Sequence, residues 1–210
     1  MHFCPLCNHA GKIILKNTTT RFFECTCCKG IFIPSNKLPD AKAEKERYLA
    51  HNNDVNDKHY QQFVNPIVQK VLKDFTPAAM GLDYGAGTGP VIAKLLEENN
   101  YSIALYDPFF HNYPDIFKKK YDFIVCCEVI EHFHSPGKEF VRLKSLLNPG
   151  GKLYCMTHIY QPDKIKFESW YYKNDPTHVF MYQEETLKYI KKNIAFSRMT
   201  IEGRLIIFEN

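Results

Sequence analysis

Long apolar runs and a large excess of either charge are both missing from this sequence of 210 residues. No stretch approaches the roughly 20 uncharged apolar residues of a membrane-spanning helix, which argues against a membrane anchor of that kind. The 27 basic residues barely outnumber the 23 acidic ones, and the net charge of +4 does not indicate a surface built to grip duplex nucleic acid. The first ten residues lack the basic and apolar stretches of a secretory leader. We therefore expect a soluble, cytoplasmic protein.

Cysteine is scarce in most of the chain, yet five of the eight cysteines lie in the first 28 residues. A disulfide framework would not be distributed in this way. Cys4-Pro-Leu-Cys7 and Cys25-Thr-Cys-Cys28 are two C-x2-C knuckles separated by 17 residues, a spacing typical of four thiolates around one zinc ion. The KIILK and RFFEC segments predict short strands beside the knuckles. Residues 1–35 are therefore predicted to form a zinc ribbon with a structural metal.

Two alternatives stay open for these cysteines. Cys27 could chelate the metal together with Cys25, although the repeated C-x2-C spacing favours Cys28. The four cysteines could also be buried without any metal. A module of about 35 residues buries little apolar surface by itself, which favours metal binding as the main source of its folding free energy.

Glycine is absent from residues 36–76, which are predicted to connect the ribbon to a larger domain. The second half of this connector carries apolar residues at the spacing of one helical face, namely Tyr60, Phe63, Val64, Ile67, Val68, Val71 and Leu72. Tyr48, His51, Asn52 and Asn53 precede that predicted helix. These polar residues are either an exposed loop or part of a lid over a neighbouring site.

After the connector, strands alternate with helices, which predicts a mostly parallel sheet covered on both faces. A short apolar strand ending at Asp83 meets Gly85-x-Gly87-x-Gly89, and a helix follows. Glycines at such a turn let the backbone approach a ligand, and the helix N-terminus favours anionic groups. Asp107 ends the next strand, where a carboxylate can accept hydrogen bonds from both hydroxyls of a ribose. The third glycine comes one residue earlier than in the dinucleotide fingerprint, which suits a cofactor without a pyrophosphate.

At these residues the chain resembles the class I S-adenosylmethionine-dependent methyltransferases. The similarity spans about residues 78–210 and is carried by Leu82–Gly89, Asp107, Tyr121–Phe133 and Leu146–Cys155. It implies a Rossmann-like α/β fold for residues 77–210, with a mostly parallel sheet and an antiparallel last strand. The resemblance also implies S-adenosylmethionine as cofactor, held by Asp83, Gly85, Ala86, Gly87, Gly89, Asp107, Pro108 and Glu128.

Two further segments extend the resemblance over the whole chain. They are Arg47-Tyr-x2-His51 in the connector and Asp175-Pro-Thr-His-Val179 near the C-terminus. Together with the ribbon they resemble a bacterial group of zinc-ribbon methyltransferases. These motifs indicate the cofactor much more strongly than the methyl acceptor.

One segment departs from the family pattern. Only 13 residues separate Asp107 from Tyr121, where the family usually has a helix, a strand and another helix. We therefore predict that the third strand is missing. A residue after that strand often contacts adenine in the family, so Pro108, Phe109 and Phe110 are candidates for this role here. The alternative is a turn that places two phenylalanines in the core or at its rim.

The carboxyl ends of the strands are where such a sheet binds ligands. Methyl transfer from a sulfonium mainly requires an aligned acceptor and, for a hydroxyl acceptor, a base that removes its proton. Histidine is suited to that task, and His132, His158 and His178 are candidates by position. We take His132 and His178 as the candidate catalytic residues.

The segment Glu128-Val-Ile-Glu131-His132 places three ligand-type side chains on one face if it is helical. It resembles a motif of ubiquinone-pathway O-methyltransferases and small-RNA 2′-O-methyltransferases that binds a divalent cation, completed in the RNA enzymes by a later histidine. One hypothesis is therefore a second divalent metal at Glu128, Glu131, His132 and His178. The other follows relatives without metal, in which the first glutamate faces the cofactor and the histidine lines the acceptor pocket.

The favoured function is an S-adenosylmethionine-dependent methyltransferase that acts on a small molecule or a carrier-bound metabolite. Residues 167–172, which hold the only tryptophan, Trp170, are either part of the acceptor pocket or an aromatic cap on the core. An RNA methyltransferase guided by the ribbon is one alternative, which the weak net charge disfavours. A non-catalytic scaffold that binds the cofactor is another, and the intact glycine motif disfavours it. The oligomeric state stays open.

Overall fold

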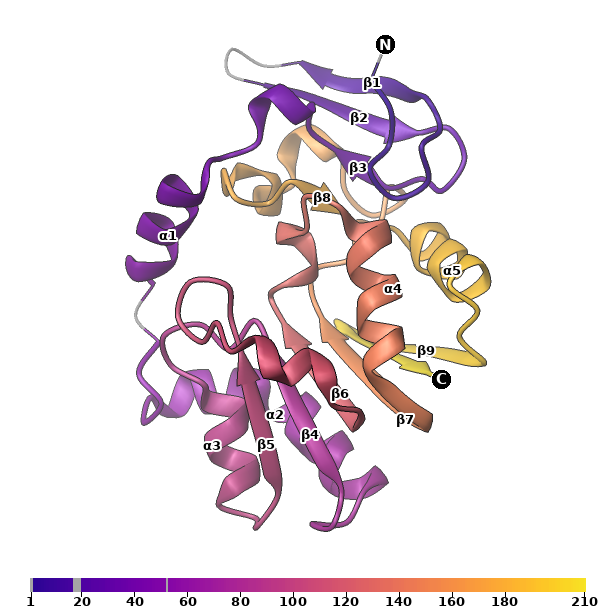
Figure 1. Cartoon of the computed structure of the whole chain (residues 1–210). Helices are drawn as coiled ribbons and strands as arrows, with labels where there is room; N and C mark the ends of the chain where they lie inside the picture. Colours follow the sequence, from indigo (N-terminus) through magenta and orange to yellow (C-terminus); the bar gives the residue numbers. More distant parts are fainter. Residues whose placement is uncertain (1, 17–19, 52) are drawn as a thin grey trace.

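A six-stranded sheet forms the centre of the computed structural model, which describes residues 2–16, 20–51 and 53–210 (Figure 1). Its strand order is β5-β4-β6-β7-β10-β9. These strands are β4 (Met80–Tyr84), β5 (Ser102–Tyr106), β6 (Tyr121–Cys127), β7 (Leu147–Met156), β9 (Arg198–Glu202) and β10 (Leu205–Glu209). The first four of them pair in parallel, whereas β10 runs antiparallel to both β7 and β9. The predicted mostly parallel sheet with an antiparallel last strand is confirmed.

Helices cover both faces of this sheet. They are α2 (Lys58–Asp74), α3 (Val91–Glu97), α4 (Pro136–Leu146) and α5 (Glu184–Asn193). Side chains alternate between the two faces of a strand: in β6, Phe123 and Val125 join the core under α2 and α3, and Ile124 and Cys126 join the core under α4 and α5. Among the described residues, no helix is long and apolar enough to cross a membrane.

Helix α2 presents the apolar face that the sequence predicts. Val64, Ile67 and Val68 are each at most 3% exposed and pack with α3 and the sheet. Full burial of such a side chain contributes about 1.5–3 kcal/mol. Asp57 caps the helix by accepting a hydrogen bond of 2.8 Å from the N–H of His59. This helix therefore fixes the end of the connector against the domain.

The sheet ends at β5 on one side. Between Asp107 and Tyr121, where every residue is described, the only helix or strand is the short 3-10 helix η2 (Pro114–Lys118). Its Ile116 is buried, and the carbonyl of Ile116 accepts a hydrogen bond of 2.9 Å from the hydroxyl of Tyr121. Thirteen residues are too few for a crossover that adds a parallel strand and returns. The predicted loss of the third strand is confirmed.

The N-terminal residues form a second sheet, of order β1-β2-β3-β8, above the first in Figure 1. Its strands are β1 (Gly11–Lys16), β2 (Arg21–Cys25), β3 (Ile31–Phe32) and β8 (Phe180–Met181). Strand β8 comes from the far end of the chain and pairs antiparallel with β3. No sequence pattern predicted it, because two residues carry no periodicity. The ribbon is thus joined to the rest of the molecule by a shared sheet.

Helix α1 (Ala41–Leu49) links the ribbon to α2 and lies at one side of the molecule in Figure 1. It follows the short 3-10 helix η1 (Ser35–Lys37), and Asp40 caps it through a hydrogen bond of 2.9 Å from the N–H of Ala43. None of its residues is buried. This helix is therefore held by polar and ring contacts of single side chains rather than by a buried apolar face.

Candidate active site

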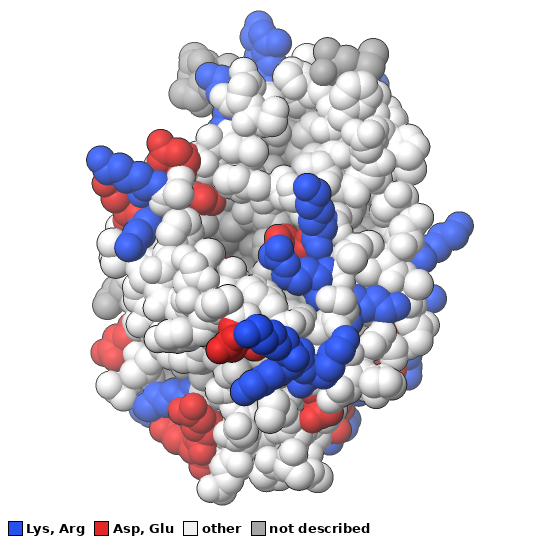
Figure 2. Space-filling model, in the orientation of Figure 1, with Lys and Arg blue, Asp and Glu red and all other residues white. Residues whose placement is uncertain are grey.

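A cavity of about 980 Å³ lies beyond the carboxyl ends of β4, β5 and β6. The face of the molecule in Figure 2 is hollowed near its centre, beside several basic side chains. Five of the nine histidines line the cavity, namely His51, His132, His134, His158 and His178. A volume of this size is at the upper end of the usual range for ligand pockets and suits a cofactor together with a small second ligand.

The turn between β4 and α3 has a backbone that requires its glycines. Gly85 and Gly87 have φ angles of +91° and +61°, a region in which side chains are strained. A Cβ on Gly85 would lie 2.4 Å from a methyl group of Val129. The N–H of Gly85 donates a hydrogen bond of 2.7 Å to the carbonyl of Tyr106 at the end of β5. The predicted cofactor loop, with Ala86, therefore lies directly beside Asp107 and lines the cavity.

The connector crosses closely over this glycine loop. A Cβ on Gly89 would lie 1.8 Å from the carbonyl oxygen of Asn53, so only glycine allows the two segments to meet. The side-chain nitrogen of Asn53 would lie 3.5 Å from a Cβ on Gly87. Asn52, which the sequence analysis grouped with Asn53, is outside the described residues. This contact places Asn53 of the connector directly against the glycine loop.

Asp107 is held in place at the mouth of the glycine loop. Its Oδ2 accepts a hydrogen bond of 3.1 Å from the N–H of Gly87, and its Oδ1 accepts hydrogen bonds from the N–H groups of Phe109 (2.8 Å) and Phe110 (3.2 Å). Pro108 and both phenylalanines line the cavity. The carboxylate is thereby oriented before any ligand arrives, which reduces the ordering cost of binding.

Asp83, at the end of β4, is 4% exposed. Burial raises the pKa of its carboxyl group to about 7, and the nearby charge of Asp107 acts in the same direction. The proton of Asp83 is thus retained close to neutral pH, so this residue adds little negative charge beneath the glycine loop.

We expect this buried acid to make stability pH-dependent. Between about pH 6.5 and 8, the free energy of unfolding should fall by about 1 kcal/mol more in the wild type than in Asp83→Asn. In the native state Asp83 holds its proton up to about pH 7, whereas the unfolded chain releases it near pH 3.8. The native state binds more protons in this window, so its stability is lost as the pH rises through the folded pKa. Urea unfolding across this range measures the difference, and parallel curves for the two proteins would contradict it.

Glu128 follows β6 in a left-handed backbone conformation, with φ of +52°. Its N–H donates a hydrogen bond of 2.8 Å to the carbonyl of Met156. Its carboxylate forms an ion pair with Arg204, and its Oε2 lies 3.2 Å from the hydroxyl oxygen of Tyr172. The segment therefore does not continue as a helix from Glu128, and the expected helical face with Glu131 and His132 at its i+3 and i+4 positions does not form.

Arg204 is a cavity residue that the sequence analysis did not identify. It lies between β9 and β10, and its guanidinium group stands 4.6 Å from the ring centre of Phe63. Because β10 is antiparallel to β7, the turn before β10 must lie near the carboxyl end of β7. An antiparallel last strand was predicted, so this geometric rule would have found Arg204. The residue brings a positive charge to the cavity beside Glu128.

His132 and His178 come together from two distant segments, with ring centres 5.0 Å apart. His132 ends the short 3-10 helix η3 (Ile130–His132), and His178 lies two residues before β8. The Nδ1 of His132 is 2.8 Å from the carbonyl of Thr177, and that of His178 is 2.7 Å from the carbonyl of Tyr172. A carbonyl oxygen only accepts, so each Nδ1 carries the proton and each Nε2 keeps a free lone pair.

Both imidazoles are in this neutral form near pH 7. Burial lowers the pKa of His178 to about 4, and the neighbouring His132 contributes to the shift. Burial also lowers the pKa of His132, against the opposing effect of its hydrogen bond to Thr177. Each Nε2 is therefore available to accept a proton or to bind a metal ion.

Glu131 completes this group and is fully buried. One carboxylate oxygen accepts a hydrogen bond from the hydroxyl of Tyr172, while Oε2 has no hydrogen-bond partner among the described residues. Burial raises the pKa of Glu131 to about 7. Ligand atoms of Glu131, His132 and His178 all lie within 4.8 Å of one another. The structure thus brings together three of the four residues of the second metal hypothesis, without Glu128.

Other predicted residues lie at the edge of the cavity or outside it. His158 lines the cavity, with its Nε2 2.9 Å from the hydroxyl of the exposed Tyr171. Trp170 is only 5% exposed and packs in a core cluster with Phe22 and Ile31 of the ribbon. It does not line the cavity, so it is the aromatic cap of the sequence analysis rather than a part of the acceptor pocket.

Helix α1 closes one side of the cavity through charged and aromatic contacts. Arg47 donates two hydrogen bonds, of 3.1 and 2.6 Å, to Oδ2 of Asp175. The ring of Tyr48 contacts those of Phe109 and His132, with centres 5.8 and 5.3 Å apart. The Arg47 guanidinium holds the pKa of the Asp175 carboxyl well below its usual range, against the opposing effect of burial. Tyr48 thereby spans the region between the predicted adenine pocket and the histidines.

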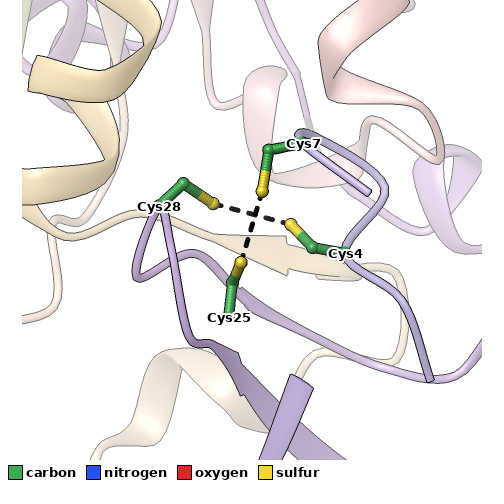
Figure 3. Close-up of side chains that lie close together, drawn as sticks. All are labelled: Cys4, Cys7, Cys25 and Cys28. Carbon is green, nitrogen blue, oxygen red and sulfur yellow. Dashed lines mark hydrogen bonds between the residues drawn. The ribbon is translucent and has the colours of Figure 1, made fainter. Parts of the chain in front are cut away.

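The predicted zinc ligands converge from two knuckles of the ribbon (Figure 3). The sulfur atoms are 3.5 Å apart in the pair Cys4–Cys28 and 3.3 Å apart in the pair Cys7–Cys25. In a tetrahedral site with Zn–S bonds of about 2.3 Å, sulfur atoms lie about 3.8 Å apart. The donor set and its geometry therefore fit a zinc ion, and Cys27 lies outside this four-cysteine group.

Comparisons with known proteins agree with this architecture. A family described as "Methyltransferase domain" matches residues 57–196. No curated protein matches the sequence.

Solved structures with the same fold have low sequence identity to this chain. An O-methyltransferase family protein from Burkholderia thailandensis has a TM-score of 0.57 at 12% identity, over 82% of this chain and 64% of its own. The 1,6-didemethyltoxoflavin-N1-methyltransferase of the same organism, solved with 1,6-didemethyltoxoflavin and S-adenosylhomocysteine, has a TM-score of 0.56 at 14% identity, over 95% and 99% of the two chains. Human N-acetylserotonin methyltransferase, in complex with SAM, has a TM-score of 0.54 at 12% identity, over 81% and 56%. The chain thus spans less than two thirds of two of these proteins.

Proposed function

This chain belongs to the methyltransferase domain family, and on that premise we propose that it transfers the methyl group of S-adenosylmethionine to a small molecule or a carrier-bound metabolite. One observation carries the proposal: a single cavity holds both a glycine loop with an oriented acid and a pair of neutral histidines. The glycine loop and its acid suit a nucleoside cofactor, and the two histidines suit an acceptor that must lose a proton.

The residues of the cavity fit this cofactor. Asp107 would accept hydrogen bonds from the ribose hydroxyls, and Gly85 and Gly87 allow close approach of the backbone. Phe109, with Pro108, would pack against the base. Glu128, paired with Arg204, offers carboxylate oxygens at the far end of the loop. When bound, the cofactor supplies an activated methyl group, and the protein need only place the acceptor and handle its proton.

His132 and His178 would handle that proton. Each presents a free Nε2 lone pair, because its Nδ1 donates to a backbone carbonyl. The acceptor's O–H or N–H proton would pass to one of these nitrogens as its oxygen or nitrogen bonds to the methyl group, whose bond to the sulfonium sulfur would break to leave S-adenosylhomocysteine. Tyr48 and Arg47 of α1 would exclude water from this side of the cavity.

Two experiments test this function in sequence. Calorimetric titration with S-adenosylhomocysteine should show one binding site per chain. A metabolite extract incubated with methyl-labelled S-adenosylmethionine should then yield a labelled product with the wild type but not with the His132→Ala/His178→Ala double variant. Absence of S-adenosylhomocysteine binding by the folded protein would overturn the proposal.

We also propose that the four cysteines Cys4, Cys7, Cys25 and Cys28 hold a structural zinc ion. The convergence of their sulfur atoms supports it, and such a site closes around the metal without an open position for catalysis.

We propose a divalent metal at Glu131, His132 and His178 as the alternative use of the same two Nε2 atoms, in place of the histidine base. The unpartnered Oε2 of Glu131 is an observation that supports it, since a buried carboxylate oxygen without a partner is costly. Both histidines also donate their Nδ1 protons to backbone carbonyls, an arrangement typical of metal-ligating imidazoles. Such an ion would orient an acceptor oxygen and lower its pKa.

Manganese provides a direct test of this second site. We expect added Mn²⁺ to broaden the NMR ring signals of His132 and His178 by its paramagnetism, and Glu131→Gln to weaken this binding at least about 10-fold, in line with the loss of a charged ligand. Glu128→Gln is the matched control and should retain Mn²⁺ binding, because Glu128 faces Arg204. Ring signals that stay sharp at millimolar Mn²⁺ would exclude the second metal site and leave the two histidines as general bases without metal.

A further inference from the structure

The segment 177–182 lies between the ribbon and η3 (Ile130–His132), which we call the candidate catalytic loop because it carries Glu131 and His132. On one side, each residue of η3 has a hydrogen bond with it. The hydroxyl of Tyr182 donates to the carbonyl of Ile130 (2.9 Å), and the N–H of Val179 donates to that of Glu131 (3.0 Å). The Nδ1 of His132 donates to the carbonyl of Thr177, as described above. The same segment carries His178. The segment 177–182 therefore sets the positions of the Glu131, His132 and His178 side chains.

On the other side, the segment is a strand of the ribbon sheet. β8 pairs with β3 through Ile31 and Phe32, and the N–H of Ile33 donates a hydrogen bond of 3.2 Å to the carbonyl of Val179. Val179 thus gives its N–H to the catalytic loop and its C=O to the ribbon. The side chain of Gln183 adds a hydrogen bond of 2.7 Å to the carbonyl of Lys29.

The contact between the two parts is also tightly packed. Gly30 lies against the ring of Phe180, and a Cβ added to it would come within 2.3 Å of the ring. Phe180 and Tyr182 share one core cluster with three of the ribbon cysteines, Cys4, Cys25 and Cys28. Interiors packed in this way transmit small shifts rather than absorbing them.

The cofactor side of the cavity is built from different elements. The glycine loop and Asp107 depend on β4, β5 and α3, none of which pairs with the ribbon sheet. A change in the ribbon therefore reaches the histidines through backbone hydrogen bonds of the segment that holds β8, whereas it reaches β4 only through side chains of the shared core cluster.

We propose that the metal-loaded ribbon is a positioning element of the active site, which holds His178, His132 and Glu131 in register through β3 and β8. This inference rests on the proposed function for the meaning of the histidines, and on the proposed zinc for the rigidity of β3. The residues of the ribbon touch no reacting group; they act through the strand pair.

The first test removes the metal from the full-length protein with a chelator and a thiol-directed reagent. We expect the ring signals of His132 and His178 to shift in NMR spectra and the amide of Val179 to exchange with solvent at least about 10-fold faster, as for any hydrogen bond released by local opening. The Kd for S-adenosylhomocysteine should change less than about threefold, which corresponds to under about 1 kcal/mol.

A second test keeps all cysteines and the metal. Gly30→Ala places its methyl group against Phe180, so we expect the same histidine shifts with one zinc still bound per chain. Adding Phe180→Leu to this variant relieves the overlap and should return the histidine signals towards their wild-type positions. A ribbon that only adds stability would lower the unfolding temperature of Gly30→Ala without moving these ring signals.

The outcomes separate this inference from the proposed function. Unchanged histidine signals in Gly30→Ala overturn the positioning role, even if metal removal unfolds the whole chain. Absence of S-adenosylhomocysteine binding by the zinc-loaded wild type overturns the proposed function instead, because the histidine readout needs neither cofactor nor acceptor.

Discussion

Replacing Cys28 with serine should release the ribbon zinc and lower the unfolding midpoint by about 10 °C. Binding of structural zinc supplies about 10–16 kcal/mol in isolated zinc-finger peptides. The loss of stability should be smaller in this protein, because the ribbon also packs on β8 and the domain core without the metal. A remaining loss of a few kcal/mol gives a shift of this size in a chain of about 200 residues. Metal analysis and thermal unfolding measure the two effects.

Cys27→Ser is the matched control for this experiment. Cys27 is exposed and lies next to Cys28, but outside the group of four converging sulfur atoms. This variant should keep one zinc per chain and the wild-type unfolding midpoint. Loss of zinc in Cys27→Ser with retention in Cys28→Ser would instead show that the metal uses the Cys25-x-Cys27 pair.

Asp107→Ala should weaken S-adenosylhomocysteine binding about 100-fold. Hydrogen bonds to a charged group contribute about 1.5–3 kcal/mol each, and the loss of roughly 3 kcal/mol corresponds to this factor. The Asp107 carboxylate also fixes the glycine loop through the N–H of Gly87, so the variant loses the preorganised loop as well. Isothermal titration calorimetry measures the change in Kd.

Asp115→Ala controls for the removal of a carboxylate from the segment that follows Asp107. Asp115 is exposed on η2 and, among the residues that the structure describes, pairs with the side chain of Lys118 at 2.7 Å. The Asp115→Ala protein should bind S-adenosylhomocysteine with the affinity of the wild type. An Asp107→Ala protein that stays folded and binds with wild-type affinity would remove Asp107 from the cofactor site.

Local chemistry was predictable from the sequence wherever spacing itself determines the geometry. Gly85 and Gly87 lie at the positive φ angles that such a turn requires, and Asp107 follows the next strand as predicted. The cysteine knuckles also converge because two tight turns have few ways to arrange their thiols. The missing third strand followed from the 13 residues between Asp107 and Tyr121, compared with the longer segment of the resembled family.

Placements that depend on distant segments were not predictable. Trp170 is buried in a cluster with Phe22 of the ribbon, which lies nearly 150 residues earlier in the chain. Glu128 was expected on a helical face with Glu131. Instead it pairs with Arg204, which lies in the distant β9–β10 hairpin. Periodicity describes a segment's own surface and not the partner that covers it, so such contacts need the folded structure.

The pairing of β3 with β8 also affects the order in which the protein folds during synthesis. Residues 31–32 leave the ribosome long before residues 180–181, so the ribbon sheet has to wait for its fourth strand while nearly the whole domain is made. Domains generally fold as units during translation, N-terminal part first. In this chain an early metal ion would keep the emerging ribbon folded, with its β3 edge unpaired, until the last part of the chain arrives. Metal supply during translation, rather than in the finished protein, would then decide how much of the chain folds correctly.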